Sequence, residues 1–233
     1  MKNLEKFAEL KKRTKSERMI AIVGMIEYEQ IADIGTDHGY IPIFACLSGY
    51  VKSAIGCDIL PGPLSTAEKN IKEYNLQDHI SLRLGNGLTP LKIGEADTII
   101  ITGMGGKTII DILNMKQNNR YVAKTAKQLI LSPQSSVPSV RRIVHDFGFI
   151  IKNEIMMKEN NRYYNILNCV VGSETYSPEE YLLGKILIQE KSDYFVEYLQ
   201  SEIMHIKKIL DKPIDSKKRK ELESLLNIYI RNM

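Results

Sequence analysis

The sequence predicts a doubly wound parallel α/β sheet followed by an α-helical hairpin. Apolar runs of strand length alternate with helix-like segments up to about residue 171, which is typical of strands joined by crossover helices. The run 96–102 is almost unbroken in its apolar character, as in a strand that helices cover on both faces. The pattern changes after a turn-rich stretch at 172–178. We therefore expect one domain at 1–172 and a helical hairpin domain at 173–233.

The elements of the first domain follow from apolar periodicity and from Gly and Pro punctuation. The basic stretch 1–30 predicts one or two helices ahead of the first strand. We then expect strands that begin at 31 and that span 53–58, 79–84, 96–102 and 128–131. Helices are expected at 40–49, at 63–74, from about 107 onward and at 137–147. The segments 149–157 and 162–171 are expected to form a closing antiparallel hairpin.

Two helices are predicted in the C-terminal part. Apolar residues recur there with 4-3-4 and then 3-4 spacing, which indicates an antiparallel, coiled-coil-like hairpin. They are Leu199, Ile203, Ile206 and Leu210, followed by Leu222, Leu225 and Tyr229. The turn between the helices is rich in Lys and Arg. Such a run is either a solvated turn or a surface that binds phosphates.

The composition excludes several classes of protein. The chain has 233 residues, 43% of them hydrophobic, and a net charge of +4, which is too mild to indicate a nucleic-acid binder by itself. Cys46, Cys57 and Cys169 are widely spaced and form no metal-binding motif, so we expect free core thiols in a reducing cytoplasm and no metal. The early apolar run 19–26 is too short to span a membrane. We expect a cytoplasmic protein without a membrane partner.

The most informative stretch is 31–42, where a strand ends in an acidic, glycine-containing turn that opens a helix. Such a turn lets the backbone approach a nucleotide-like ligand, and an acid about 20 positions later takes ribose hydroxyls. Asp58, 23 positions after Gly35, fits that role. Asp37 breaks the dinucleotide fingerprint because its carboxylate would repel a pyrophosphate. A ligand with an adenosine, a positive charge and no phosphate fits instead, and S-adenosylmethionine is such a ligand.

Within this turn, Asp33 can hold backbone amides and meet the cationic amino group of the ligand. Asp37 and His38 are expected at the helix start nearest the ligand. A lone His near a helix terminus is more often structural than catalytic. The alternative interpretation of the whole stretch is a structural turn whose polar residues only cap the helix.

Three later loops fall at the ends of predicted strands. The stretch 85–88, Gly-Asn-Gly-Leu, lies where a side-chain amide can receive the exocyclic amine of adenine; a simple Gly-Asn turn is the alternative. The stretch 103–108 looks like a phosphate loop but fails the Walker A spacing, because Ile101 stands where Gly is required. We interpret it as a floor beneath the methionine part of the ligand. The turn 132–134 is a candidate for holding a target base, or else a common turn.

Taken together, these stretches resemble the bacterial tRNA adenine-22 N1-methyltransferases. The resemblance rests on Ala32 to Pro42, Asp58 with Gly62 and Pro63, Thr102 to Gly106, Leu131 to Gln134, and Ser16 to Arg18. It covers about residues 16–171, and the C-terminal hairpin is similar in kind. Asn86 and Gln134 depart from the family pattern, which has Asp and Asn at these two positions. The adenine contact is therefore expected to be an amide, and the contact to the target base is altered.

The resemblance implies a Rossmann-like class I methyltransferase fold and transfer of a methyl group from S-adenosylmethionine to N1 of adenine 22 in tRNA. It implies cofactor contacts from Asp33, Gly35, Thr36, Asp37, His38, Gly39, Tyr40, Asp58, Gly85, Asn86, Gly87, Gly103 and Met104. It implies catalytic roles, in orienting the methyl group and the base, for Asp37, His38, Ser132, Pro133 and Gln134. It implies tRNA contacts from Arg18, and the basic turn adds Lys217, Lys218, Arg219 and Lys220.

This reaction depends more on in-line positioning of the methyl group and the base than on a strong general base, because N1 of adenine attacks with a free lone pair. Its edge is masked in a paired base, so the base must be exposed or flipped, and Tyr40 or Tyr163 is a candidate for stacking on it. The alternatives are methylation of adenine N6 in RNA, a nonenzymatic RNA-binding protein on the same fold and a nicotinamide dehydrogenase, which Asp37 argues against. We expect tRNA as the partner and a monomer as the oligomeric state.

Overall fold

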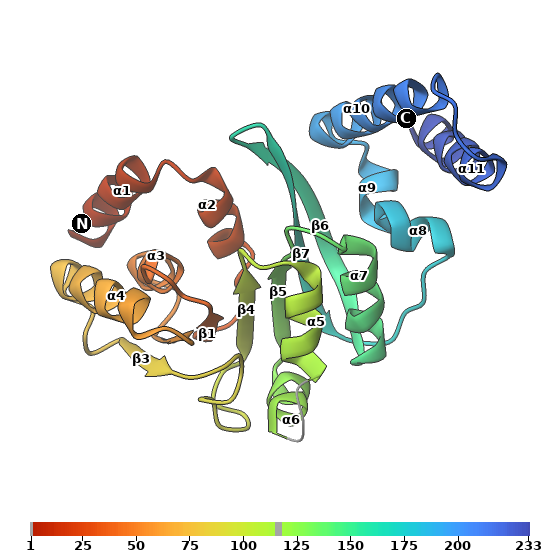
Figure 1. The fold of residues 1–233 in the computed structure, drawn as a ribbon. Helices are drawn as coiled ribbons and strands as arrows, with labels where there is room; N and C mark the ends of the chain where they lie inside the picture. Colours follow the sequence, from red (N-terminus) through yellow and green to blue (C-terminus); the bar gives the residue numbers. More distant parts are fainter. Residues whose placement is uncertain (1, 115–117) are drawn as a thin grey trace.

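The structure is a computed structural model that describes residues 2–114 and 118–233. It contains one seven-stranded sheet with helices on both faces, and a group of helices that follows it (Figure 1). The strands are β1 (Gln30–Ile34), β2 (Ser53–Asp58), β3 (Ile80–Leu84), β4 (Thr98–Thr102), β5 (Gln128–Ser132), β6 (Phe149–Glu159) and β7 (Arg162–Val171). The helices are α1 (Lys2–Thr14), α2 (Glu17–Gly24), α3 (Tyr40–Leu47), α4 (Pro61–Tyr74), α5 (Gly106–Asn114), α6 (Asn118–Thr125), α7 (Val137–Asp146), α8 (Pro178–Leu183), α9 (Lys185–Glu190), α10 (Asp193–Leu210) and α11 (Ser216–Asn232).

The strand order is β3-β2-β1-β4-β5-β7-β6, with the first five strands parallel and the last two antiparallel. This is the predicted doubly wound sheet with its closing hairpin. The carboxyl ends of the five parallel strands lie in register, since Ile34 is opposite both Cys57 and Ile101, and Thr102 is opposite Ser132. The loops that follow these strands therefore meet at one edge of the sheet, which is where open α/β sheets bind their ligands.

The alternation of side chains along each strand divides the core into two layers. On β4, Ile99 and Ile101 pack with α5, α6 and α7, whereas Ile100 packs with the layer that contains residues of α1 to α4. All three isoleucines are completely buried. The almost unbroken apolar run predicted for this strand is thus explained by burial on both faces. The three cysteines are free and buried, as expected, and burial raises the pKa of the Cys46 and Cys57 thiols to about 12.

The hairpin of β6 and β7 is longer than the other strands and turns at Asn160 and Asn161, which both have positive φ values of 50° and 60°. A two-residue turn of this conformation matches the twist of the two strands. Figure 1 shows the hairpin reaching beyond the sheet towards α10. Met156 of β6 belongs to the same apolar cluster as residues of α8 to α11, so the hairpin also supports the C-terminal helices.

The connection between the sheet and the C-terminal helices is buried and charged. The guanidinium of Arg141 on α7 pairs with the Glu154 carboxylate on β6 at 2.6 Å, and both side chains are almost wholly buried. Arg141 also donates to the carbonyls of Tyr181, Leu182 and Leu183, which end α8. One side chain therefore satisfies carbonyls that the helix end would otherwise leave without partners.

Some predicted boundaries were wrong. Helix α4 begins at Pro61 rather than Pro63, because a proline at the first helical position needs no hydrogen-bond partner. Helices α6, α8 and α9 were not predicted. They are short, with six to eight residues each, and so carry too little periodicity to be recognised from the sequence. Within the described residues, none of the helices is long and apolar enough to cross a membrane.

Candidate functional site: a donor cleft at the strand ends

The turn after β1 lies across the end of β2. The amides of Gly35 and Thr36 donate to the Cys57 carbonyl at 2.8 and 2.9 Å, and the amide of Asp37 donates to the Asp58 carboxylate at 3.2 Å. The expectation that Asp33 holds these amides was therefore wrong. The neighbouring strand supplies the acceptors because the turn leaves β1 towards β2. Gly35 and Asp37 have positive φ values of 75° and 49°, which direct the turn over the sheet edge.

Asp58 organises the end of β2. Its carboxylate accepts the amide of Asp37 through one oxygen and the amide of Leu60, at 3.0 Å, through the other. A carboxylate has about four lone-pair sites, so both oxygens can still accept hydrogen bonds from a ligand. The next residue, Ile59, is a large apolar side chain that is 58% exposed. The sequence reasoning missed Ile59, although an apolar residue directly after the acid of β2 was the available signal.

Asp33, near the end of β1, is a buried carboxylate with an altered acidity. Burial raises its pKa to about 7, and the nearby carboxylates of Asp58 and Asp37 act in the same direction. A cation placed beside Asp33 would favour its charged form and lower this pKa again. The arrangement is therefore suited to a positively charged ligand.

The residues that open α3 are held by the neighbouring helix. Gly39 has a φ of 73° and would bring a Cβ to within 3.1 Å of Ala67 on α4. The carbonyl of His38 accepts a hydrogen bond from the Asn70 side chain at 2.8 Å. The side chains of Asp37 and His38 are 65% and 47% exposed, and the Asp37 carboxylate lies 3.5 Å from Nε2 of His38. These two side chains therefore face the solvent side of the turn, with the Tyr40 ring 5.6 Å from that of His38.

The loop after β4 closes over the turn after β1. A Cβ on Gly35 would lie 2.3 Å from the terminal methyl group of Met104, so the glycine is required for this contact. Gly103, the residue before Met104, has a φ of 74°. Two segments that are far apart in the sequence are thus in direct contact at the strand ends.

The turn after β5 is joined to the same loop. The amide of Gln134 donates to the Met104 carbonyl at 2.9 Å, and the amide of Gly106 donates to the Ser135 carbonyl at 3.0 Å. Ser132 and Pro133 are buried, whereas Gln134 is exposed. Among the described residues, the Ser132 hydroxyl has no hydrogen-bond partner although it is buried. A buried polar atom without a partner costs free energy, which a polar ligand group or a water molecule would recover.

The turn after β3 borders the other side of Asp58. The amide of Gly85 donates to the Asp58 carbonyl at 2.9 Å, and Gly87 has a φ of 57°. The backbone carbonyl of Asn86 accepts hydrogen bonds from the amide and the hydroxyl of Thr89, and Asn86 itself is exposed. The pairing of β2 with β3 thus brings this turn beside Asp58.

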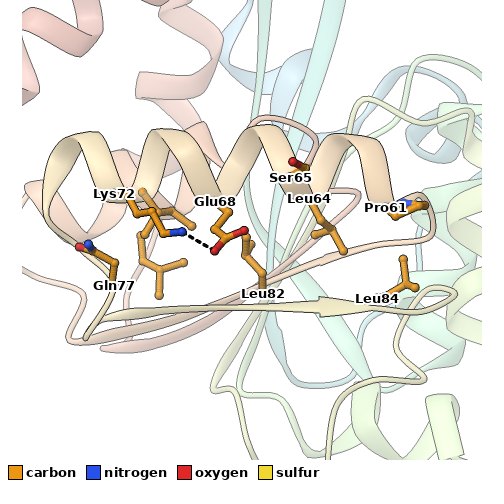
Figure 2. Close-up of a pocket in the computed structure, with 10 residues that line it drawn as sticks. Pro61, Leu64, Ser65, Glu68, Lys72, Gln77, Leu82 and Leu84 are labelled. Carbon is orange, nitrogen blue, oxygen red and sulfur yellow. Dashed lines mark hydrogen bonds and ion pairs between the residues drawn. The ribbon is translucent and has the colours of Figure 1, made fainter.

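A cavity of about 640 Å³ lies between α4 and β3 at the outer edge of the sheet (Figure 2). Leu64, Leu82 and Leu84 line it together with the Glu68–Lys72 ion pair, and its Pro61 and Leu84 end comes next to the Asp58 region. The lining comes from a helix face and a strand face rather than from the strand ends. This cavity is therefore a groove beside the donor cleft and not the cleft itself.

Comparison with known proteins decides which ligand the cleft serves. Residues 31–232 match the model of the family described as tRNA (adenine(22)-N(1))-methyltransferase. The chain belongs to this family. The enzyme of that name from Bacillus subtilis strain 168 is 31% identical over 187 residues, which cover 78% of this chain and 77% of that protein.

Solved structures agree with the family assignment. The m1A22 tRNA methyltransferase of B. subtilis has a TM-score of 0.83 at 28% identity, covering 93% of this chain and 97% of that chain. The M. capricolum relative, solved with S-adenosyl-homocysteine, has a TM-score of 0.81 at 28% identity, covering 93% and 96%. A Streptococcus pneumoniae relative was solved with S-adenosyl-L-methionine, with a TM-score of 0.85 at 28% identity, covering 93% and 98%. The protein is thus an S-adenosylmethionine-dependent methyltransferase with the Rossmann-like fold.

The strand ends of this methyltransferase carry features suited to a cationic ligand with polar groups. Asp33 supplies a buried carboxylate for a cationic ligand, Gly35 supplies a left-handed backbone conformation that other residues rarely adopt, and Ser132 supplies a hydroxyl without a partner among the described residues. The described residues contain no group of three or more His, Cys, Asp or Glu side chains that could hold a metal ion. The donor itself supplies an electrophilic methyl group on a sulfonium.

The methyltransferase structure does not bring all predicted residues to the cleft. Arg18 lies at the start of α2, where its guanidinium is 3.5 Å from Glu159 and 4.5 Å from the Tyr164 ring centroid, with only 16% of the side chain exposed. The basic residues Lys217 to Lys220 begin α11, and Figure 1 shows α11 well apart from the strand ends. A role for these residues requires a substrate long enough to reach them from the cleft.

Proposed function

We propose that this methyltransferase transfers the methyl group of S-adenosylmethionine to N1 of adenine 22 in tRNA. One observation carries the proposal: the loops after β3 and β4 contact Asp58 and Gly35, and the β5 turn is bonded to the β4 loop, in a chain whose residues 31–232 match one tRNA methyltransferase family. The loop contacts support binding of a cationic adenosine ligand, and the family match supports the choice of tRNA.

In this proposal the donor lies along the strand ends. Asp33 faces the cationic methionine part, Asp58 accepts the ribose hydroxyls, and the Asn86 amide accepts the exocyclic amine of adenine. Ile59, exposed beside Asp58, covers one face of the adenine ring. The remaining contacts come from the backbone of Gly35, Thr36, Gly39, Gly85, Gly87 and Gly103, together with Tyr40 and Met104.

The target base enters from the side of the β5 turn. Asp37, His38 and the turn of Ser132, Pro133 and Gln134 orient the base so that the lone pair of N1 points at the methyl carbon. No proton has to leave N1 before the attack, so none of these groups must act as a strong base. The rate then depends on in-line positioning in a site from which water is excluded. The positive charge moves from the donor to the purine during transfer, and the exposed carboxylate of Asp37 is suited to offset it.

The rest of the tRNA is held outside the cleft. We propose that the basic turn of Lys217, Lys218, Arg219 and Lys220 binds its phosphates, and that Arg18 contributes from the N-terminal side. Because α11 lies well apart from the strand ends in Figure 1, these contacts require an extended substrate, and tRNA is one. We propose a monomer of two domains, 1–172 and 173–233, that works in the cytoplasm.

The deciding experiment is methylation of unmodified tRNA transcripts with labelled S-adenosylmethionine, followed by mapping of the modified nucleotide. We expect N1-methyladenosine at position 22 and no incorporation when adenine 22 is replaced by guanine. Mass spectrometry separates N1-methyladenosine from N6-methyladenosine, and the N6 product would overturn the proposed chemistry. Incorporation into a different nucleotide would overturn the proposed position while leaving the donor cleft intact.

A further inference from the structure

A groove leads from the β5 turn to the tip of the β6–β7 hairpin. It consists of two cavities of about 250 Å³ and about 390 Å³, which share Gln134, Tyr163 and Tyr198. The larger cavity ends at Arg162 and Tyr164, and the smaller one continues between α7 and the C-terminal helices. We call it the tyrosine groove. Its residues come from the sheet part of the chain and from α8, α10 and α11, so it exists because the C-terminal helices pack on the hairpin.

The aromatic wall of the tyrosine groove is fixed from both sides. The rings of Tyr163 on β7 and Tyr198 on α10 meet edge to face, with their centroids 5.5 Å apart. The ammonium of Lys158 on β6 lies 5.2 Å from the Tyr163 ring and forms an ion pair with Glu197 on α10 at 2.5 Å. The two rings are only partly buried, so each still presents surface to the groove.

The outer end of the tyrosine groove is lined by the exposed Arg162, and the Arg18–Glu159 pair lies beside it. Arg162 is exposed directly after the Asn160–Asn161 turn, and the guanidinium of Arg18 lies over the neighbouring Tyr164 ring at 4.5 Å. Flat aromatic surfaces beside arginine and lysine groups are the combination with which proteins bind single-stranded nucleic acid. The bases stack on the rings and the cations meet the phosphates.

We propose that the tyrosine groove binds an unpaired nucleotide of the RNA substrate that lies next to the reacting adenosine. The groove is not lined by any residue of the turn 33–40 or of the loop 103–106. Its inner end shares Pro133 and Gln134 with the turn that orients the reacting base, so we assign the neighbouring base to the part between Tyr163 and Tyr198. The groove begins at Gln134, whose backbone is bonded to Met104 in the donor cleft. A flipped base in the cleft leaves its chain neighbour in position to enter the groove.

This inference rests on the proposed function, because it assumes an RNA substrate with a flipped base. Its consequence is that substrate choice depends on the nucleotide beside the target and not only on the target. Stacking on aromatic rings tolerates any base, so the groove would add affinity without strict sequence specificity.

A fluorescent reporter tests the groove directly, since the protein contains no tryptophan. The variant Tyr163→Trp places a single indole in the groove, and stacking of a base should quench its emission. We expect saturable quenching by unmodified tRNA transcript in the presence of S-adenosylhomocysteine, and no quenching by S-adenosylhomocysteine alone. The matched control is Tyr50→Trp, at a tyrosine that is 51% exposed and bonded to the Glu27 carbonyl, ahead of β2. Equal emission changes in the two variants at saturating tRNA would overturn the proposal.

Kinetics provide a second test, which distinguishes stacking of a base on Tyr163 from a purely structural role of this residue. We expect Tyr163→Ala to raise the KM for tRNA on the order of tenfold, with kcat and the affinity for S-adenosylmethionine little changed. Tyr163→Phe keeps the ring and should restore the KM. An unchanged KM in Tyr163→Ala, or a Phe variant as impaired as the Ala variant, would contradict stacking.

The two levels of the proposal fail in different ways. If the methyl group appears on another nucleotide while the reporter is still quenched, the position assigned to the reaction is wrong and the groove remains a nucleotide site. If adenine 22 is methylated while the reporter is not quenched, the groove is wrong and the proposed function stands.

Discussion

At the scale of single residues, burial of the Asp33 carboxylate destabilises the ligand-free protein and favours binding of a cationic donor. Its pKa near 7 means that the folded protein binds more protons than the unfolded chain between about pH 4 and pH 7. The free energy of unfolding of the ligand-free protein therefore falls as the pH rises through this window, because this carboxyl ionises in the unfolded chain while it stays largely protonated in the folded protein. Binding of a cationic donor favours the charged form of Asp33 and so lowers its pKa again.

The first prediction concerns the pH dependence of donor binding. Below pH 7, the donor has to displace a proton from Asp33. We therefore expect its dissociation constant to rise by up to about tenfold for each pH unit below 7 and to level off above about pH 8. Titration calorimetry in two buffers of different ionisation enthalpy counts the released protons. A proton count near zero at pH 6 would contradict the assignment of Asp33.

The second prediction concerns removal of this carboxylate. We expect Asp33→Ala and the equally shaped Asp33→Asn to abolish binding of S-adenosylmethionine. At pH 8 their unfolding temperatures should be no lower than that of the parent, because each removes a buried charge. The matched control is Asp97→Ala, which removes a carboxylate just before β4, at the opposite end of the strands, where it pairs with Lys127. Unchanged donor affinity in the Asp33 variants would overturn the placement of the donor cleft.

At the scale of elements, two loops depend on how closely their backbones approach. A Cβ on Gly106 would lie 2.3 Å from the Ser135 carbonyl oxygen, whereas a Cβ on Gly105 would meet only the Ser135 hydroxyl at 3.3 Å. The first contact involves backbone that cannot move without disturbing the β5 turn. The second involves the end of a flexible side chain.

The third prediction follows from this pair of glycines. Gly106→Ala should lower the free energy of unfolding by about 1–3 kcal/mol, in the range of overpacking substitutions. Gly105→Ala should change it by less than about 0.5 kcal/mol. Urea denaturation monitored by circular dichroism measures both. Equal stability of the two variants would show that the β4 loop and the β5 turn are not held together in this way.

The Arg141–Glu154 pair acts between elements rather than within one. It joins α7 and β6, and through Arg141 it holds the end of α8. Asn165 on β7 also donates to Glu154, at 2.9 Å. The position of the helices that form one side of the tyrosine groove therefore depends on a charge pair in the interior.

The fourth prediction is that Arg141→Met destabilises the protein by about 3–5 kcal/mol, because it leaves the Glu154 carboxylate buried without its partner. Replacing both residues, with Arg141→Met and Glu154→Leu, should recover part of this loss. The matched control is the neighbouring Arg142→Met, because Arg142 is exposed and its guanidinium lies 4.1 Å from the Tyr181 ring centroid. This variant should lose about 1 kcal/mol or less of the free energy of unfolding. A loss in Arg141→Met no larger than in Arg142→Met would contradict the role of the pair.

At the scale of the whole molecule, the strand ends and the basic residues that begin α11 lie far apart, as Figure 1 shows. The C-terminal helices contact the sheet part of the molecule through α7 and through the β6–β7 hairpin. A substrate that uses both must extend over the hairpin and therefore past the tyrosine groove.

The fifth prediction separates binding of the tRNA backbone from binding of the donor. Replacing Lys217, Lys218, Arg219 and Lys220 by Gln should weaken tRNA binding and reduce its dependence on salt, because fewer counterions are released. The affinity for S-adenosylmethionine should stay unchanged. The control replaces the same number of exposed lysines elsewhere, namely Lys52, Lys69, Lys92 and Lys124. If filter binding gives the same tRNA dissociation constant for the parent and the first variant, the turn is only a solvated surface.

Much of the fold and part of the site could be predicted from the residues in order along the chain. The alternation of apolar runs indicated the parallel sheet, since strands buried on both faces have no polar side to show. Gly35, Asp37 and Asp58 indicated a donor other than a dinucleotide, because the sign of a charge at a turn is a local property. Helices of six to eight residues, such as α8, lay outside the reach of periodicity.

The sequence by itself determined the class of sheet, the order of its loops and the charge of the ligand that they accept. Tertiary structure alone decided which acceptor holds each amide of the β1 turn and how far burial raises the pKa of Asp33. It also decided that the Tyr198 ring of α10 lies beside the Tyr163 ring of β7. The physical reason is that the position of a strand and the charge of a turn depend on residues that are neighbours in the sequence. Burial, close backbone contacts and a groove between two packed units depend on residues that the chain brings together only after folding.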